Sequence, residues 1–155
     1  MKKENYQAII IANKPAAACM DAINHVNEWW TAGFEGKTSR VNDSFKVDFG
    51  KTFVDFRVIE THPGKKLVWL VTDCNIQGIK DKLEWKGTKV VWDLKPIKEG
   101  TEITMTHIGL VPEVECFDMC QTGWNFYVKT SLLKLLTEGN GLPDKRVEYS
   151  KASIS

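Results

Sequence analysis

The stretch GWNFYVKTSLLKLL, from Gly123 to Leu136, decides how the rest of the chain must fold. It is the longest helix-like segment, and it is apolar over more of its surface than an exposed helix needs. At about 100° per residue, this segment and the residues before it show one polar stripe: Asp118, Gln121, Thr122, Asn125 and Lys129. The opposite side mixes aromatic rings with hydroxyls and thiols: Cys116, Met119, Cys120, Gly123, Trp124, Phe126, Tyr127, Thr130 and Ser131. This side is predicted to face partly a packed core and partly a cavity.

Gly123 lies in the middle of this apolar side. A glycine inside a helix costs about 1 kcal/mol relative to alanine, so the position needs a reason. Either the helix approaches a strand closely there, or the missing side chain leaves room for a ligand. The sequence leaves both explanations open.

Strands and turns are predicted between Gly33 and Gly109. Alternating apolar residues predict an antiparallel sheet with one solvated face. The inward-facing set is Phe45, Val47, Phe49, Val54, Phe56, Val58, Val90, Trp92, Leu94, Ile103, Met105 and His107. Residues 67–73 form a nearly continuous apolar strand, and 75–85 read as a loop with one short extended piece.

Before this region, the sequence predicts a strand and two short helices. The strand covers residues 6–11. The first helix begins with Asn13 as its cap and Pro15 in its first turn, and the second covers 24–30.

A sheet with one apolar face must be covered by another layer, and only the last helix is long enough to do so. The predicted fold is therefore α+β and of the helix-grip type: a curved antiparallel sheet wrapped around a long C-terminal helix, with two short helices after the first strand. We predict one domain over residues 1–138 and a polar tail over 139–155, frayed or loosely docked.

Four segments together resemble a known superfamily: NEWWT (27–31), EWKGTKVVWDLKP (84–96), GTEITMTHIGL (100–110) and the opening helix. They resemble START-like (SRPBCC, Bet v 1-like) proteins, in particular the branch named for the activator of heat-shock protein 90 ATPase. The resemblance covers about residues 5–138. It implies a helix-grip fold with a cavity between the concave sheet and the last helix. Family members bind hydrophobic or amphipathic small molecules, and some are polyketide cyclases.

The candidate site residues are those expected to face that cavity. We predict ligand contacts from Phe56, Trp69, Trp92, Met105, His107, Met119, Cys120, Gly123, Trp124 and Tyr127. The tryptophans among them could stack on a planar ligand or simply build the core. No motif of a hydrolase, zinc protease, phosphate loop or dinucleotide site is present, so no catalytic residue is assigned. His107 is the one candidate: it is either a general base or a core histidine bonded to a neighbour.

Composition excludes several partners. The chain has 155 residues, with 21 Lys and Arg against 20 Asp and Glu, a net charge of +1. Without a basic excess or stripe we expect no nucleic-acid binding, and without a long apolar run no membrane insertion. The N-terminus has no signal-peptide pattern, which predicts the cytoplasm.

The four cysteines and the oligomeric state complete these expectations. Buried thiols are expected rather than disulfides. A metal site from Cys116, Cys120 and His107 lacks the tight pairing of zinc ligands. We therefore expect no metal and no cofactor, and a monomer or a weak dimer.

Three functions are ranked on these grounds. First comes non-enzymatic binding of a small hydrophobic or aromatic ligand, lipid-, polyketide- or flavonoid-like. Second comes a cyclase or hydrolase with His107 as base and Tyr127 as hydrogen-bond donor. Third comes a protein-interaction role like that of the chaperone activator, through an apolar patch at Trp29 and Trp30. The chaperone partner ranks last because the eukaryotic activator also relies on a separate N-terminal domain, for which 155 residues leave no space.

Overall fold

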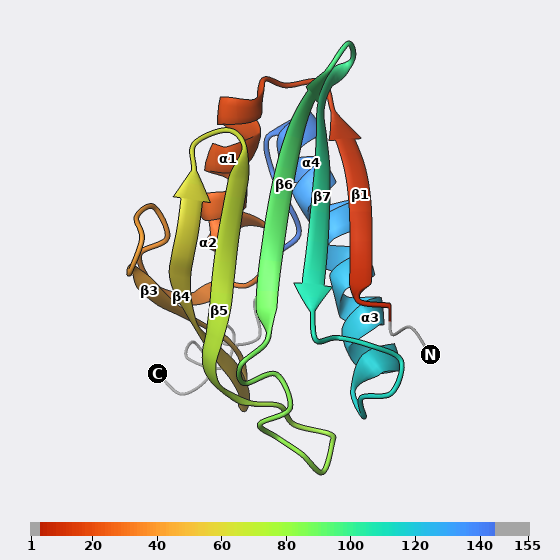
Figure 1. The fold of residues 1–155 in the computed structure, drawn as a ribbon. Coiled ribbons are helices and arrows are strands. Elements are labelled where there is room, and N and C mark those ends of the chain that lie inside the picture. The colour runs from red at the N-terminus through yellow and green to blue at the C-terminus, as the bar shows by residue number, and fades with distance from the viewer. Residues whose placement is uncertain (1–3, 145–155) are drawn as a thin grey trace, which may run out of the picture.

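A seven-stranded antiparallel sheet forms one layer, and the helices form the other (Figure 1). This computed structural model describes residues 4–144. Along the sheet the strand order is β1-β7-β6-β5-β4-β3-β2. The elements are β1 (Tyr6–Ala12), α1 (Ala16–Asn24), α2 (Val26–Trp29), β2 (Gly33–Gly36), β3 (Ser44–Phe49), β4 (Thr52–His62), β5 (Lys66–Asn75), β6 (Lys89–Ile97), β7 (Gly100–Ile108), α3 (Phe117–Phe126), the π-helical segment η1 (Tyr127–Leu132) and α4 (Leu133–Glu138). The predicted helix-grip fold is confirmed.

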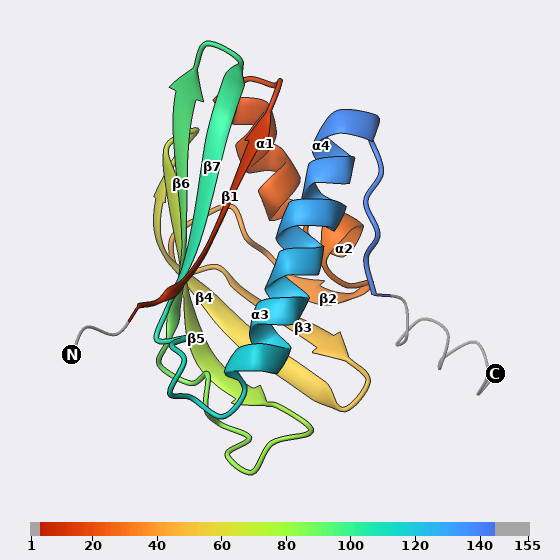
Figure 2. The ribbon, with the colours of Figure 1, turned by 90° about the vertical axis from the view of Figure 1, so that its right-hand side faces the viewer.

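The sheet is apolar on the side that faces the helices, as the alternation predicts. All of the residues expected to face inward are buried, except Phe49, which is half-buried. Two register shifts interrupt the β4–β5 pairing, between Asp55 and Phe56 and between Val58 and Glu60. Such bulges bend the strand that carries them and increase the twist of the sheet. They curve this half of the sheet toward the helices, which all lie on its concave face (Figure 2).

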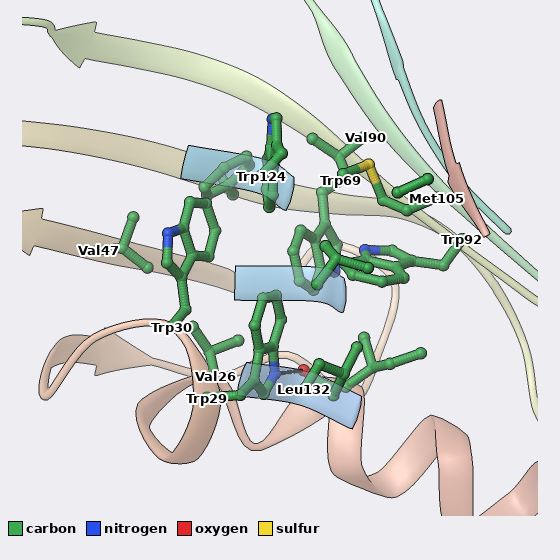
Figure 3. Close-up of a cluster of buried hydrophobic side chains, with 14 of the residues drawn as sticks. Val26, Trp29, Trp30, Val47, Trp69, Val90, Trp92, Met105, Trp124 and Leu132 are labelled. Atoms are coloured by element: carbon green, nitrogen blue, oxygen red, sulfur yellow. Dashed lines mark hydrogen bonds between the residues drawn. The ribbon is translucent and has the colours of Figure 1, made fainter. Parts of the chain in front are cut away.

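Indole rings fill the space between the two layers (Figure 3). Trp29 meets Trp92 edge-on with ring centroids 5.6 Å apart, and Trp92 meets Trp69 at 5.5 Å. Trp30 packs on Trp124 of α3 at 4.7 Å. Such aromatic pairs add about 0.5–1.5 kcal/mol beyond the area they bury. Because Trp29 and Trp30 are themselves buried, the exposed apolar patch predicted at these two rings is wrong.

Three local predictions are corrected. The cap of α1 is Pro15, in an extended conformation and without a side-chain hydrogen bond, rather than Asn13. The short strand β2 was not predicted, because its GFEG sequence has almost no alternation to read. Between Asn75 and Lys89 the chain forms turns only, without the short extended piece expected there.

The last helix changes its geometry halfway, where residues 127–132 form a π-helix. Its wider turn, with i→i+5 hydrogen bonds, rotates each residue by less than the ~100° of an α-helix. Thr130, predicted to face inward, is therefore exposed. The same adjustment brings Leu132 and Leu136 into line with the core, where both are buried. Phe126, also predicted inward, is 42% exposed.

Ser131 fastens this helix to both the α2 region and the C-terminal segment. Its buried hydroxyl donates to the Trp29 carbonyl at 2.6 Å and accepts from the Leu142 N–H at 2.7 Å. The backbone at Gly141 lies so close to α2 that a Cβ at this position would be 2.5 Å from the Glu28 carbonyl oxygen. The segment from 139 to 144 is thus docked on the fold, although it belongs to the predicted tail. The rest of that tail, 145–155, lies outside the described residues.

Replacing Ser131 with alanine is expected to lower the free energy of unfolding by about 1–3 kcal/mol, because the buried Trp29 carbonyl and the Leu142 N–H both lose their partner. Urea denaturation measures the change. Thr137→Ala is the matched control, since its exposed hydroxyl bonds only the Leu133 carbonyl of its own helix. Equal losses in the two variants would contradict the role given to Ser131.

Candidate functional site

A pocket of about 450 Å³ opens at one end of the interface between the last helix and the sheet. Its size lies within the range of small-molecule sites. Four parts of the chain contribute: the end of α2, the β3–β4 hairpin, the loop after β5, and α3 with the first residue of η1. The lining residues are Trp30, Phe49, Lys51, Thr52, Val54, Ile76, Gln77, Trp85, Met119, Cys120, Gly123, Trp124 and Tyr127.

The helix contributes residues spaced by three or four positions, which lie on one face. The side predicted to be buried divides into two strips. Cys120 and Trp124 turn toward the core and are buried, whereas Met119 is 48% exposed and Tyr127 is half-buried beside the pocket. The helix is thus half core and half pocket wall. Gly123 lies between the strips.

Gly123 leaves open space. A Cβ built on this residue would have no atom within 4 Å, apart from its own helix backbone and chain neighbours. The explanation by close approach of a strand is therefore wrong. The missing side chain instead widens the pocket that Gly123 lines.

Two carboxylates hold the loop after β5 against the start of α3. Glu115 accepts hydrogen bonds from the backbone N–H groups of Lys80, at 2.8 Å, and Asp81, at 3.2 Å. These donors hold the pKa of Glu115 below its usual value. In the reverse direction, Glu84 accepts from the N–H groups of Glu115 and Cys116 at 2.8 and 2.9 Å. These contacts position Trp85 as a wall of the pocket.

His107 lies behind that wall and does not line the pocket. Its Nδ1 accepts the indole N–H of Trp124 at 3.0 Å, so Nε2 carries the proton and donates to the Thr88 hydroxyl at 2.9 Å. Thr88 in turn donates to the Trp85 carbonyl at 2.5 Å. Burial lowers the pKa of His107 to about 3, which keeps the ring neutral. Of the two roles open from the sequence, the structure supports the core histidine: both nitrogens are engaged, and the ring cannot reach a ligand as a base.

The ten predicted ligand contacts fall into two groups. Met119, Cys120, Gly123, Trp124 and Tyr127 line the pocket. The other five lie in the packed core instead: Phe56, Trp69, Trp92, Met105 and His107. All five have the predicted inward orientation, but they are buried among neighbouring side chains and do not line the pocket.

The residues that sequence reasoning missed come mostly from the hairpin and the loop. Phe49 and Val54 belong to the alternation, which places them inward at the end of the β3–β4 pair where the sheet projects past the core. Lys51 and Thr52 follow from the turn between these strands. No comparable signal marks Ile76 or the other loop residues, because they have no periodic pattern.

The four cysteines are buried thiols, as expected. Within residues 4–144, no three His, Cys, Asp or Glu side chains cluster in a way that could hold a metal ion. In the same part of the chain, no helix has the length and apolar character needed to span a membrane.

Comparison with known proteins identifies relatives of this fold. The family model described as Activator of Hsp90 ATPase homolog 1-like protein matches residues 22–137. The structure titled as the Aha1 dimer from Colwellia psychrerythraea is 22% identical with a TM-score of 0.71, and the match covers 91% of this chain and 100% of that one. The protein MLL2253 from Mesorhizobium loti is 19% identical with a TM-score of 0.69, covering 90% of this chain and 100% of that one.

A third relative is DynU16, a protein of the dynemicin biosynthetic locus. It is 19% identical with a TM-score of 0.69, and the match covers 90% of this chain but only 49% of that chain. No curated protein matches the sequence. At these identities the structural likenesses establish the shared fold, and function must be argued from the site.

The neutral state of His107 predicts a loss of stability in acid. The unfolded chain binds a proton at His107 below pH ~6.5, whereas the folded protein does so only near pH 3. The unfolded state therefore holds more protons between these values, and the free energy of unfolding falls by about 1.4 kcal/mol per pH unit as the pH drops. Urea denaturation of the wild type and of His107→Asn, which keeps an acceptor for Trp124, isolates this contribution. An identical pH slope in both proteins would contradict it.

Proposed function

Because this chain belongs to the Activator of Hsp90 ATPase homolog 1-like family, whose fold commonly binds ligands, we propose that it binds a small hydrophobic or aromatic molecule without catalysis. The observation that carries the proposal is the pocket beside Gly123. A helix that keeps a glycine facing open space, between aromatic walls, maintains a cavity at a cost in its own stability.

The lining indicates the chemistry of the ligand. Trp30, Phe49, Trp85, Trp124 and Tyr127 offer ring surfaces to an apolar or planar body. Trp85 and Trp124 stack with an angle of 8° between their planes, 5.9 Å apart, so one continuous aromatic wall is available. Pockets of this kind take apolar ligands and fix their orientation with a few polar groups.

Lys51 is the one charged residue of that lining. None of the ion pairs found among residues 4–144 involves it. Thr52 and Gln77 add hydrogen-bonding groups on the same side, since the Thr52 hydroxyl accepts the Gln77 N–H at 3.0 Å. The ligand we propose is therefore an apolar, partly aromatic molecule with one acidic group placed at Lys51.

The two alternative functions have less support. A cyclase or hydrolase that uses His107 is disfavoured because that ring is sealed behind Trp85 and Trp124. A chaperone-activator role loses its expected docking patch, because Trp29 and Trp30 are buried. The place of DynU16 in a biosynthetic locus fits a small-molecule role. The Aha1 relative described as a dimer fits our proposal that this chain is a monomer or weak dimer.

Gly123→Leu is expected to fill the pocket and to abolish binding of a hydrophobic fluorescent probe such as anilinonaphthalene sulfonate, while the fold is kept. Thr122→Leu is the matched control, since it adds the same side chain at the next, exposed position of the helix. Probe fluorescence and circular dichroism are measured for both variants. Unchanged probe binding in Gly123→Leu would place the binding surface elsewhere and overturn the proposal.

Lys51→Gln tests the acidic group separately. For a naphthyl carboxylic acid the dissociation constant is expected to rise roughly fivefold, the ~1 kcal/mol of a partly exposed ion pair. The methyl ester of the same acid should bind both proteins equally. Isothermal titration at low salt measures the dissociation constants of both ligands. An equal change in the two constants would exclude a charge contact.

Native mass spectrometry of the purified protein, with extraction of any retained compound, identifies the natural ligand class.

A further inference from the structure

Two thiols meet beside the pocket: Cys120 lines it, and Cys116 lies behind Cys120. The Sγ atoms of Cys116 and Cys120 lie 2.6 Å apart, only about half an ångström more than the ~2.05 Å of a disulfide bond. No comparable partner is found for the other two cysteines. Cys19 and Cys74 instead contact the backbone carbonyls of Lys14 and Lys82.

The backbone explains why these two sulfurs meet. Residues four apart on a helix lie on one face, about 5–6 Å apart at Cβ. Cys116 is the N-cap of α3, with φ −85° and ψ 3°, and is therefore not yet in the regular helix. Its side chain can lean over the first turn toward Cys120, which closes the distance that a regular helix would leave.

We propose that Cys116 and Cys120 form a redox-active dithiol, which hydrogen peroxide converts to a reversible intramolecular disulfide. In the first step, peroxide transfers an oxygen to the Cys120 sulfur, giving a sulfenic acid and water. In the second, the Cys116 sulfur attacks Cys120, the S–S bond forms, and the hydroxyl leaves with the Cys116 proton as a second water. The two thiols together lose two electrons and two protons, and the peroxide is reduced to water.

The order of the two steps follows from access. Cys120 lines the pocket and is 8% exposed, whereas Cys116 lies behind it at 1%. Both thiols are nearly buried and their sulfurs are already in contact, which favours the internal bond over a bond between chains. The contact with Cys120, together with burial, raises the pKa of the Cys116 thiol. Cys116 is therefore not the first sulfur to react with peroxide, and it becomes the resolving thiol because its sulfur already contacts Cys120.

Trp85 connects the dithiol with the pocket wall. Its indole N–H donates to the Cys116 sulfur at 3.2 Å, and its ring stacks on Trp124. Bond formation changes the sulfur that Trp85 contacts, so tryptophan fluorescence should change with the redox state. The dithiol stands on its own geometry and does not rest on the proposed ligand.

Thiol alkylation after oxidation tests the proposal directly. Trypsin releases both cysteines in one peptide, residues 99–129, which has no internal Lys or Arg and no other cysteine. After peroxide treatment, denaturation and alkylation, this peptide is expected to carry no alkyl group and to be two hydrogens lighter. Dithiothreitol added before alkylation should restore two alkyl groups. Met105 and Met119 share the peptide, but their sulfoxides keep their oxygen under dithiothreitol and leave thiol alkylation unaffected.

Single variants assign the bond. Cys116→Ser and Cys120→Ser should each lose the two-hydrogen decrease in peptide mass, and the remaining thiol should either be alkylated or gain oxygen. Cys74→Ser, the control, should keep this decrease and the fluorescence change. Two alkyl groups on the wild-type peptide after peroxide, or a bond formed only between chains, would overturn the proposal. The wild-type measurement decides this even where a variant fails to fold.

Discussion

The hydrogen bond from the Trp124 indole to His107 marks the boundary on which the rest of the structure depends. It joins the last helix to β7 of the sheet through two buried groups, neither of which can be left without its partner at low cost. On one side of it the tryptophans of the sheet and α2 are buried and pack against one another (Figure 3). On the other side the same Trp124 ring becomes a pocket wall together with Trp85. Trp124 therefore contacts the packed core and also lines the pocket, and its hydrogen bond to the neutral His107 holds it in this position.

The covering helix meets two demands that a uniform α-helix would not meet together. Near its start it must present Gly123 and Tyr127 to open space, and near its end it must pack Leu132 and Leu136 on the sheet. The π-helical segment between these parts changes the angular phase of the helix, and such segments are frequent at functional sites. Ser131, near the end of that segment, then anchors the α2 region and the returning chain. A local irregularity of the backbone thus separates the binding half of the helix from the packing half.

The loop after β5 forms one wall of the pocket. Hydrogen bonds of Glu84 and Glu115 fasten this loop to the start of α3. Cys116 and Cys120 lie at this junction, beside Trp85. The loop, the helix start and the thiols therefore form one connected unit. A chemical change at the sulfurs acts on the same wall that a ligand would touch.

The sequence alone determined the order of the long elements, though not the short strand β2, together with the inward face of each long strand, the covering role of the last helix and the family resemblance. Alternation and helix periodicity report which side of an element is apolar, and this information is local. Helix periodicity also placed the five helix residues that line the pocket on the inward side. Periodicity does not show whether an inward side chain meets packed neighbours or an open cavity. Phe56, Trp69 and Trp92 have the same pattern as true lining residues, yet neighbouring rings bury them completely. Only the tertiary structure decided where packing stops, because that depends on the bulges that curve the sheet, the π-helical phase change and the placement of an aperiodic loop.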